Sequence, residues 1–102
     1  AASAQQTLLA TAVGPAYDDV ANCLMKQMAP RLAAVPVVRP PPTNKAEVHL
    51  YPAGSERMGT PVASFFVSQE DGGRIAILFE ERPDQRGQHT VTATAAAARC
   101  AR

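Results

Sequence analysis

The sequence has few of the residues that mark nucleic-acid, membrane or redox proteins. Among 102 residues there is no Trp, and there are only three Phe, two Tyr, two His and two Cys. The formal net charge of +1 does not provide the basic stripe that nucleic-acid binding requires. No run approaches the roughly 20 consecutive apolar residues of a membrane-spanning helix. We therefore expect neither nucleic acid among the partners nor a membrane span.

Recognisable catalytic and cofactor motifs are also missing. The histidines, His49 and His89, are not arranged as His-x-x-x-His, and the cysteines do not form Cys-x-x-Cys, so we predict no metal site. The chain contains neither a glycine-rich phosphate loop nor a Gly-x-Ser-x-Gly frame. An enzyme would need an unrecognised site in which Ser55, Glu56 and His49 converge. We predict that the chain is not an enzyme and uses no cofactor.

The two cysteines, Cys23 and Cys100, lie near opposite ends of the part of the chain that is expected to fold. In an oxidising compartment such a pair most simply forms one disulfide, whereas in the cytosol both would be free thiols. The sequence begins Ala-Ala-Ser-Ala, which fits a mature protein after signal-peptide removal, although a trimmed sequence would begin in the same way. We predict a Cys23–Cys100 disulfide and a periplasmic or secreted location.

The clearest structural pattern is a β-hairpin over residues 62–81. Two runs rich in β-branched and aromatic residues flank Asp71-Gly72-Gly73, which favours a tight turn. A two-residue turn would place Phe66 on the same face as Ile77 and Phe79, and both faces of the hairpin would then be apolar. The second face would need a cover: the N-terminal segment, the proline-rich connector, or a second copy of the protein in a homodimer.

Two helices and one further strand are predicted from the spacing of apolar residues, from composition and from flanking prolines. Apolar residues at three- and four-residue steps predict a helix over 16–29, begun by Pro15 and ended by Pro30. Alternation predicts a strand over 46–51, and an alanine-rich run predicts a final helix over about 91–101.

The remaining stretches are predicted to be irregular. Residues 1–14 are expected to be a flexible N-terminal segment, preceding a single domain over 15–102. The prolines of residues 35–43 predict an extended connector, in which Val35, Val37 and Val38 could form a short edge strand. Together these elements predict an α+β fold: an N-terminal helix, an antiparallel sheet of three or four strands, and a C-terminal helix, in two layers.

A family resemblance rests on three parts of the chain: Ala21-Asn22-Cys23-Leu24, the strands through Phe79, and the alanine-rich stretch from Ala95 to Cys100. In this order they resemble small uncharacterised proteobacterial periplasmic or lipoprotein-type α+β domains with one disulfide from a helix to the C-terminus. The resemblance implies a location in the cell envelope and no particular activity.

These observations favour a non-enzymatic accessory module that binds a protein in the cell envelope. The loop over 52–61 and the second sheet face are the expected contact surfaces, and Tyr51, Arg57 and Met58 are the candidate contact residues. The alternative is a carrier that holds a small ligand or a lipid between sheet and helices, in a core poor in large side chains.

Overall fold

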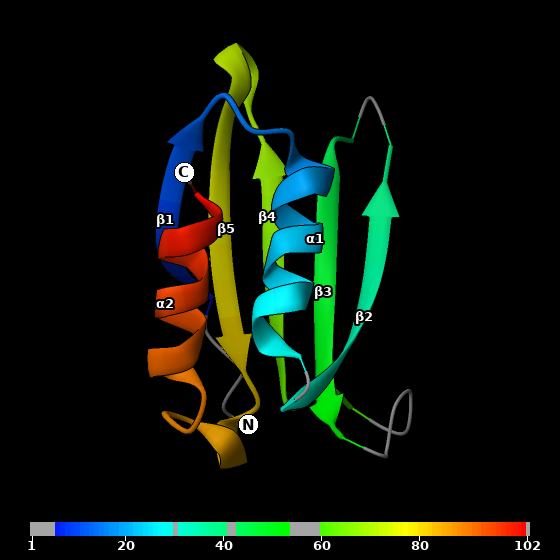
Figure 1. Ribbon diagram of the computed structural model, residues 1–102, viewed down its shortest axis with the longest axis vertical. Coiled ribbons are helices and arrows are strands. Elements are labelled where there is room, and N and C mark those ends of the chain that lie inside the picture. Colours follow the sequence, from blue (N-terminus) through cyan, green and yellow to red (C-terminus); the bar gives the residue numbers. More distant parts are fainter. Residues whose placement is uncertain (1–5, 30, 41–42, 54–59, 102) are drawn as a thin grey trace.

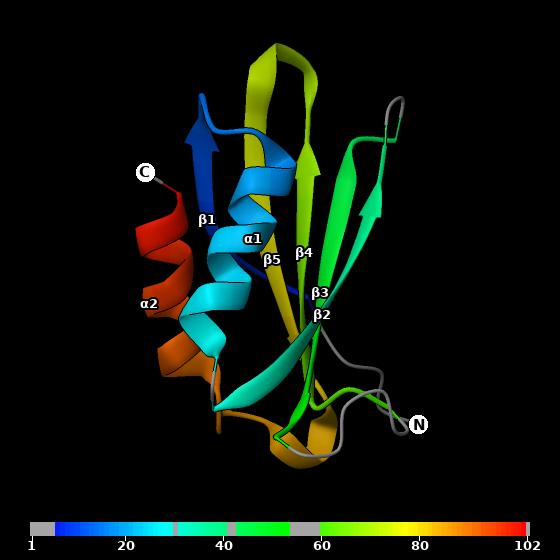
Figure 2. The same ribbon diagram turned by 45° about the vertical axis from the view of Figure 1, so that its right-hand side comes forward.

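The computed structural model describes residues 6–29, 31–40, 43–53 and 60–101, which form a two-layer α+β domain. One layer is a five-stranded antiparallel sheet and the other is a pair of helices that lie side by side on one face of it (Figure 1). Figure 2 shows that both helices are on the same side of the sheet. The elements are β1 (Thr7–Val13), α1 (Tyr17–Met28), β2 (Leu32–Arg39), β3 (Lys45–Pro52), β4 (Ala63–Gln69), β5 (Arg74–Glu81) and α2 (Thr90–Cys100).

The strand order in the sheet is β1-β5-β4-β3-β2, and the sheet is open. Strands β2 to β5 form a meander, whereas β1 lies at the far side against the last strand. The α+β class, the antiparallel sheet and both helices are as predicted from the sequence. The predicted three or four strands were too few, because the sheet contains five.

Strand β1 falls within the segment that was expected to be flexible, so that expectation was wrong over Thr7–Val13. Its small and β-branched residues show little alternation, and it has no hairpin partner nearby in the sequence. The strand exists because its backbone pairs with β5, from Thr7 against Phe79 to Val13 against Arg74, with a bulge between Leu8 and Ala10. A partner so distant in sequence leaves no local signal.

Strand β2 (Leu32–Arg39) overlaps the proline-rich connector predicted over 35–43, and that prediction was wrong over residues 35–39. The suggestion of a short edge strand near Val35 was closer to the structure. The strand pairs with β3 along its whole length, and Pro36 lies opposite Val48. An edge strand tolerates a proline when the missing N–H faces away from its neighbour.

The register of the central hairpin differs from the prediction. Phe65, not Phe66, lies opposite Phe79, and Phe66 lies opposite Leu78. The cause is the turn: Glu70 N–H donates to the Arg74 carbonyl (2.7 Å), and the three residues Asp71–Gly73 lie between them as a 3-10 turn. An odd number of turn residues reverses which side chains share a face, compared with a two-residue turn.

The corrected register places the apolar side chains on the helix-facing side of the sheet. The fully buried side chains include Phe65, Ile75 and Ile77 from the sheet and Leu24 from α1. On the outer face, polar residues alternate in space with apolar ones. The prediction that both faces of the hairpin are apolar over its central part holds on the outer face only for Phe66 and Leu78, because Ser64 lies opposite Glu80 and Ser68 lies opposite Ala76.

The predicted disulfide is present. Cys23 on α1 and Cys100 on α2 are bonded, with their Cα atoms 5.7 Å apart. Close approach of the two helices is possible because the buried face of α2 consists of small residues: Ala93, Ala96, Ala97 and Cys100. The bond fastens the last helix to the first across a sequence separation of 77 residues.

A carboxylate at the end of β5 holds the start of α2. Glu81 accepts hydrogen bonds from the Gly87 N–H (2.9 Å), the His89 N–H (3.0 Å) and the Thr90 hydroxyl (2.8 Å). Partial burial opposes ionisation of Glu81, but these hydrogen bonds, that of Gly87 foremost, outweigh burial and lower its pKa. The ionised side chain therefore stabilises the native state.

We expect Glu81→Gln to lower the free energy of unfolding by about 1 kcal/mol at neutral pH, the size of a lost helix cap. A lowered native pKa stabilises the fold above the unfolded-state pKa of the group, and this stabilisation is lost as the pH falls through the native value. The difference between the variant and the wild type in thermal unfolding should therefore be largest at neutral pH and shrink in acid. Glu80→Gln, which changes the adjacent carboxylate on the other face, is the control. A pH-independent difference would contradict this role of Glu81.

Candidate functional site

The outer face of the sheet carries a group of polar side chains that are joined by hydrogen bonds. Strand alternation brings Glu47 and His49 of β3 to this face beside Ser64 and Phe66 of β4. His49 lies opposite Ser64, and Glu47 lies opposite Phe66. Directly opposed side chains in a sheet are close enough to interact. We call these four residues the outer-face cluster.

Hydrogen bonds connect the polar members of the outer-face cluster in a row. His49 Nδ1 is 2.9 Å from Ser64 Oγ, and His49 Nε2 is 3.0 Å from Glu47 Oε1. A carboxylate can only accept in this pair, so His49 Nε2 donates to Glu47, while the Ser64 hydroxyl is able either to donate to Nδ1 or to accept from it. Arg39 of β2 extends the row, because its Nε is 3.4 Å from Glu47 Oε2. The imidazole is thereby fixed in one orientation.

Phe66 forms the apolar part of the outer-face cluster. The rings of His49 and Phe66 meet edge to face, with centroids 6.5 Å apart and an interplanar angle of 85°. Beside them lies a hollow of about 290 Å³, with Ser64 and Phe66 in its lining and Glu80, Arg82 and Pro61 around it. An apolar ring next to oriented polar groups is the usual composition of a binding site.

A hydroxyl bonded to an imidazole that is in turn bonded to a carboxylate also has the geometry of an activated nucleophile. Acyl transfer needs, in addition, hydrogen-bond donors placed for the oxyanion. Arg82 is the only Lys or Arg among the described residues that line the hollow, and its guanidinium is bound to both Asp84 oxygens (2.6 and 3.1 Å) and to the Thr60 carbonyl (3.3 Å). This bonding lowers the pKa of Asp84. Ser64 is itself only 7% exposed.

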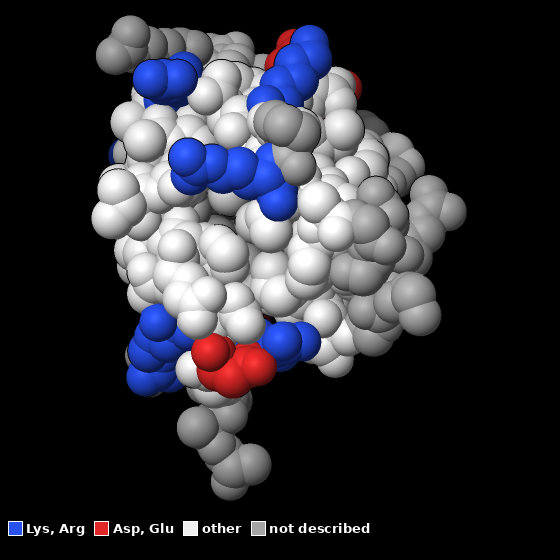
Figure 3. All heavy atoms as spheres, turned by 60° about the horizontal axis from the view of Figure 1, so that its bottom comes forward, with Lys and Arg blue, Asp and Glu red and all other residues white. Residues whose placement is uncertain are grey.

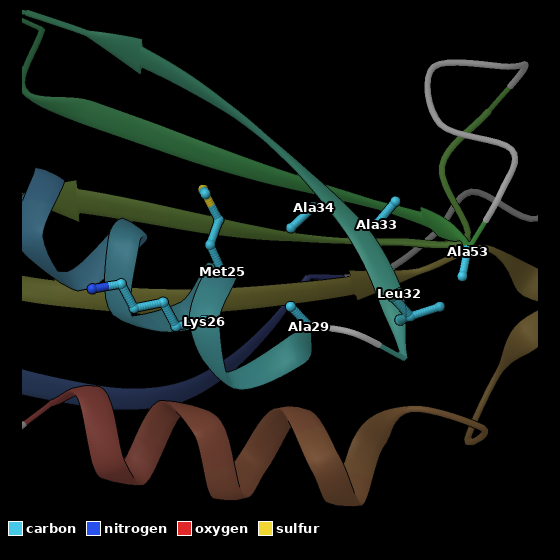
Figure 4. A pocket seen from close by; sticks show the side chains of 7 residues that line it. All are labelled: Met25, Lys26, Ala29, Leu32, Ala33, Ala34 and Ala53. Atoms are coloured by element: carbon cyan, nitrogen blue, oxygen red, sulfur yellow. The ribbon is translucent and has the colours of Figure 1, made fainter.

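A second concave feature lies on the other side of the sheet, between α1 and β2. This groove has a volume of about 370 Å³ and is lined by Met25, Lys26, Ala29, Leu32, Ala33, Ala34 and Ala53. Figure 4 shows Met25 reaching from α1 towards β2, while Lys26 points away from the alanines. The floor of the groove is thus apolar, and it exists because alanines stand where larger residues would close the gap.

The charged residues form no concentrated patch in the view of Figure 3, where basic side chains are interspersed with uncharged atoms. Within the described part of the chain, no three His, Cys, Asp or Glu side chains gather as metal ligands would. No helix among these residues is both long and apolar enough to cross a membrane.

Of the three contact residues predicted from the sequence, the structure describes only Tyr51. Tyr51 is half-buried at the end of β3, opposite Ala33 of β2. Arg57 and Met58 lie outside the described residues, as do Ser55 and Glu56 of the considered enzyme site.

Sequence reasoning missed the outer-face cluster. It treated His49 as an isolated strand residue and assigned Phe66 to the wrong face. Alternation within each strand already puts Glu47 with His49 and Ser64 with Phe66. The missing information was the register between β3 and β4, which brings the two pairs together and which no tight turn fixes.

Comparison of the chain with protein-family models, curated proteins and solved structures finds no match.

Proposed function

We propose that the chain is an exported, non-enzymatic module that binds a partner protein through the outer face of its sheet. The observation that carries the proposal is the outer-face cluster: a partly exposed aromatic ring held against a row of hydrogen-bonded polar side chains. Aromatic residues surrounded by polar groups are typical centres of protein interfaces.

The partner that fits this face has an apolar side chain for the hollow beside Phe66 and a hydrogen-bonding group for its rim. The rigid strands and the fixed imidazole reduce the entropy that binding would otherwise lose at this face. Export is supported by the Cys23–Cys100 disulfide, since such bonds persist in oxidising compartments.

We expect Phe66→Arg to weaken partner binding tenfold or more, because it removes the central ring and adds an unpaired charge. The measurement is crosslinking and capture from cell-envelope extract with tagged wild type and variant, followed by titration of the captured protein. Val91→Arg is the matched control, since Val91 is 83% exposed on α2 in the other layer. Circular dichroism should show both variants folded. Equal capture by Phe66→Arg and by the wild type would contradict the proposal.

The groove between α1 and β2 favours a second candidate, a carrier for a small apolar ligand or a lipid. Its volume is within the range of small-molecule sites, and its lining is mainly alanine and other apolar side chains. Native mass spectrometry of freshly purified protein distinguishes the two functions. A co-purifying small molecule would favour the carrier, and an unladen chain that still captures a protein would favour the binding module.

A further inference from the structure

The two edges of the open sheet, β1 and β2, differ in how they are protected. In an antiparallel sheet alternate residues bond to one neighbouring strand, and the residues between them point their backbone groups to the other side. At an edge strand, these second groups have no strand to pair with. The hydrogen bonds at the ends of the central strands show which residues of each edge point outward.

At the β2 edge, a proline removes one of the backbone donors that would otherwise point outward. The Gln69 N–H donates to the Asn44 carbonyl (3.0 Å), so the even-numbered residues of β3 bond to β4 and the odd-numbered ones bond to β2. Pro36 lies opposite the even-numbered Val48, so its backbone nitrogen faces the free edge. A proline there offers no donor to an added strand. The strand also ends in a charged residue, Arg39.

At the β1 edge, the outward backbone N–H and C=O groups are free to pair with another strand. The Glu70–Arg74 hydrogen bond directs the even-numbered residues of β5 to β4 and its odd-numbered residues, including Ile75, to β1. Ala12, the partner of Ile75, therefore bonds to β5, and the backbone groups of Thr11 and Val13 face outward.

The composition of β1 also leaves this edge unprotected. Thr7–Val13 contains neither a charged residue nor a proline. Leu8 is 56% exposed and Val13 is 74% exposed. In Figure 1 β1 is the outermost strand, and among the residues that the structure describes no strand lies beyond it in the sheet. Soluble proteins usually protect such an edge with charge, proline or a bulge in the exposed stretch, and the bulge of β1 lies only at its start.

We propose that two copies of the chain join edge to edge along β1, antiparallel to each other, and form one continuous sheet about a two-fold axis. Only another extended strand matches a row of unpaired backbone donors and acceptors. The second copy brings the same uncharged strand, so no like charges meet. Because the β2 edge is blocked at Pro36, head-to-tail growth from β1 to β2 is prevented, and the assembly closes as a dimer. The outer-face cluster stays free, so this inference is independent of the proposed function.

The test is the mass in solution of the full chain, measured by light scattering over a concentration series. The wild type should have twice the mass of one chain. Thr11→Pro removes an outward N–H without removing a bond to β5, so this variant should have the mass of one chain. Val38→Pro, at an outward position of β2, is the control and should remain dimeric. A wild type with the mass of one chain at every concentration would overturn the proposal.

Phe66→Arg and hydrogen exchange distinguish a dimer joined along β1 from one joined through the sheet face. A dimer that withstands Thr11→Pro but dissociates with Phe66→Arg would overturn the proposal, because its interface would be the sheet face. If Thr11→Pro fails to fold, Thr11→Lys and hydrogen exchange of the wild type replace it. The amides of Thr11 and Val13 should exchange more slowly as protein concentration rises, and concentration-independent exchange would also overturn the dimer.

Discussion

Replacing both cysteines, Cys23→Ala together with Cys100→Ala, should lower the free energy of unfolding by about 4 kcal/mol. The bond closes a loop across a sequence separation of 77 residues, and cross-linking so long a loop restricts the unfolded chain strongly. For a domain of this size we expect the midpoint of thermal unfolding to fall by roughly 15–20 °C. Urea titration followed by circular dichroism gives the free energy directly.

Reduction of the wild type is the matched comparison, because it opens the bond without changing the side chains. Reduced wild type and the double-alanine variant should unfold at similar urea concentrations. Alkylation before and after reduction, followed by intact mass measurement, shows whether both thiols are protected. Free thiols in protein isolated without reductant, or a midpoint that reduction does not move, would contradict the stabilising disulfide.

Phe65→Ala should destabilise the fold by about 3–5 kcal/mol, the usual cost of removing a buried phenylalanine ring. The Phe65 side chain is fully buried, and its ring centroid lies 5.2 Å from that of Phe79, with the ring planes tilted by 48°. Both rings lie on the helix-facing side of the sheet. Deleting one leaves a cavity that neighbouring strands and helices cannot fill without losing their own packing.

The matched control is the neighbouring phenylalanine. Phe66→Ala removes the same ring from the partly exposed outer face and should cost only about 1 kcal/mol. The ratio of the two effects, measured by urea unfolding, also tests the hairpin register. If Phe66→Ala were the more damaging substitution, the two-residue turn would be correct and the three-residue turn would be wrong.

The elements that depend on local pattern were predictable. The helix at Tyr17–Met28 follows from apolar spacing and flanking prolines, and the strands at β3 to β5 follow from alternation and β-branched content. The disulfide followed from counting cysteines, although the compartment remained an assumption. Each of these signals lies within a few residues of the structure that it predicts.

What depends on distant pairing was not predictable. Strand β1 forms only by pairing with β5, which is distant in the sequence. Strand β2 was not predicted in full because its prolines argue against a strand, and an edge strand accepts a proline only where the missing N–H faces away from its neighbour. The outer-face cluster depends on the register between β3 and β4, which no tight turn connects, so the sequence did not show which of their residues lie opposite each other. Among the candidate contact residues, only Tyr51 lies in the described chain.

The position of β1 has a consequence for the order in which the protein folds. The meander from β2 to β5 can form from successive local hairpins, each closing a short loop. Strand β1 is made before the other strands of the sheet, and its partner β5 is the last strand to be made, so β1 stays unpaired until the rest of the sheet has been synthesised. The uncharged Thr7–Val13 segment is therefore open to aggregation until β5 has been made, and chaperone binding during synthesis would be directed there.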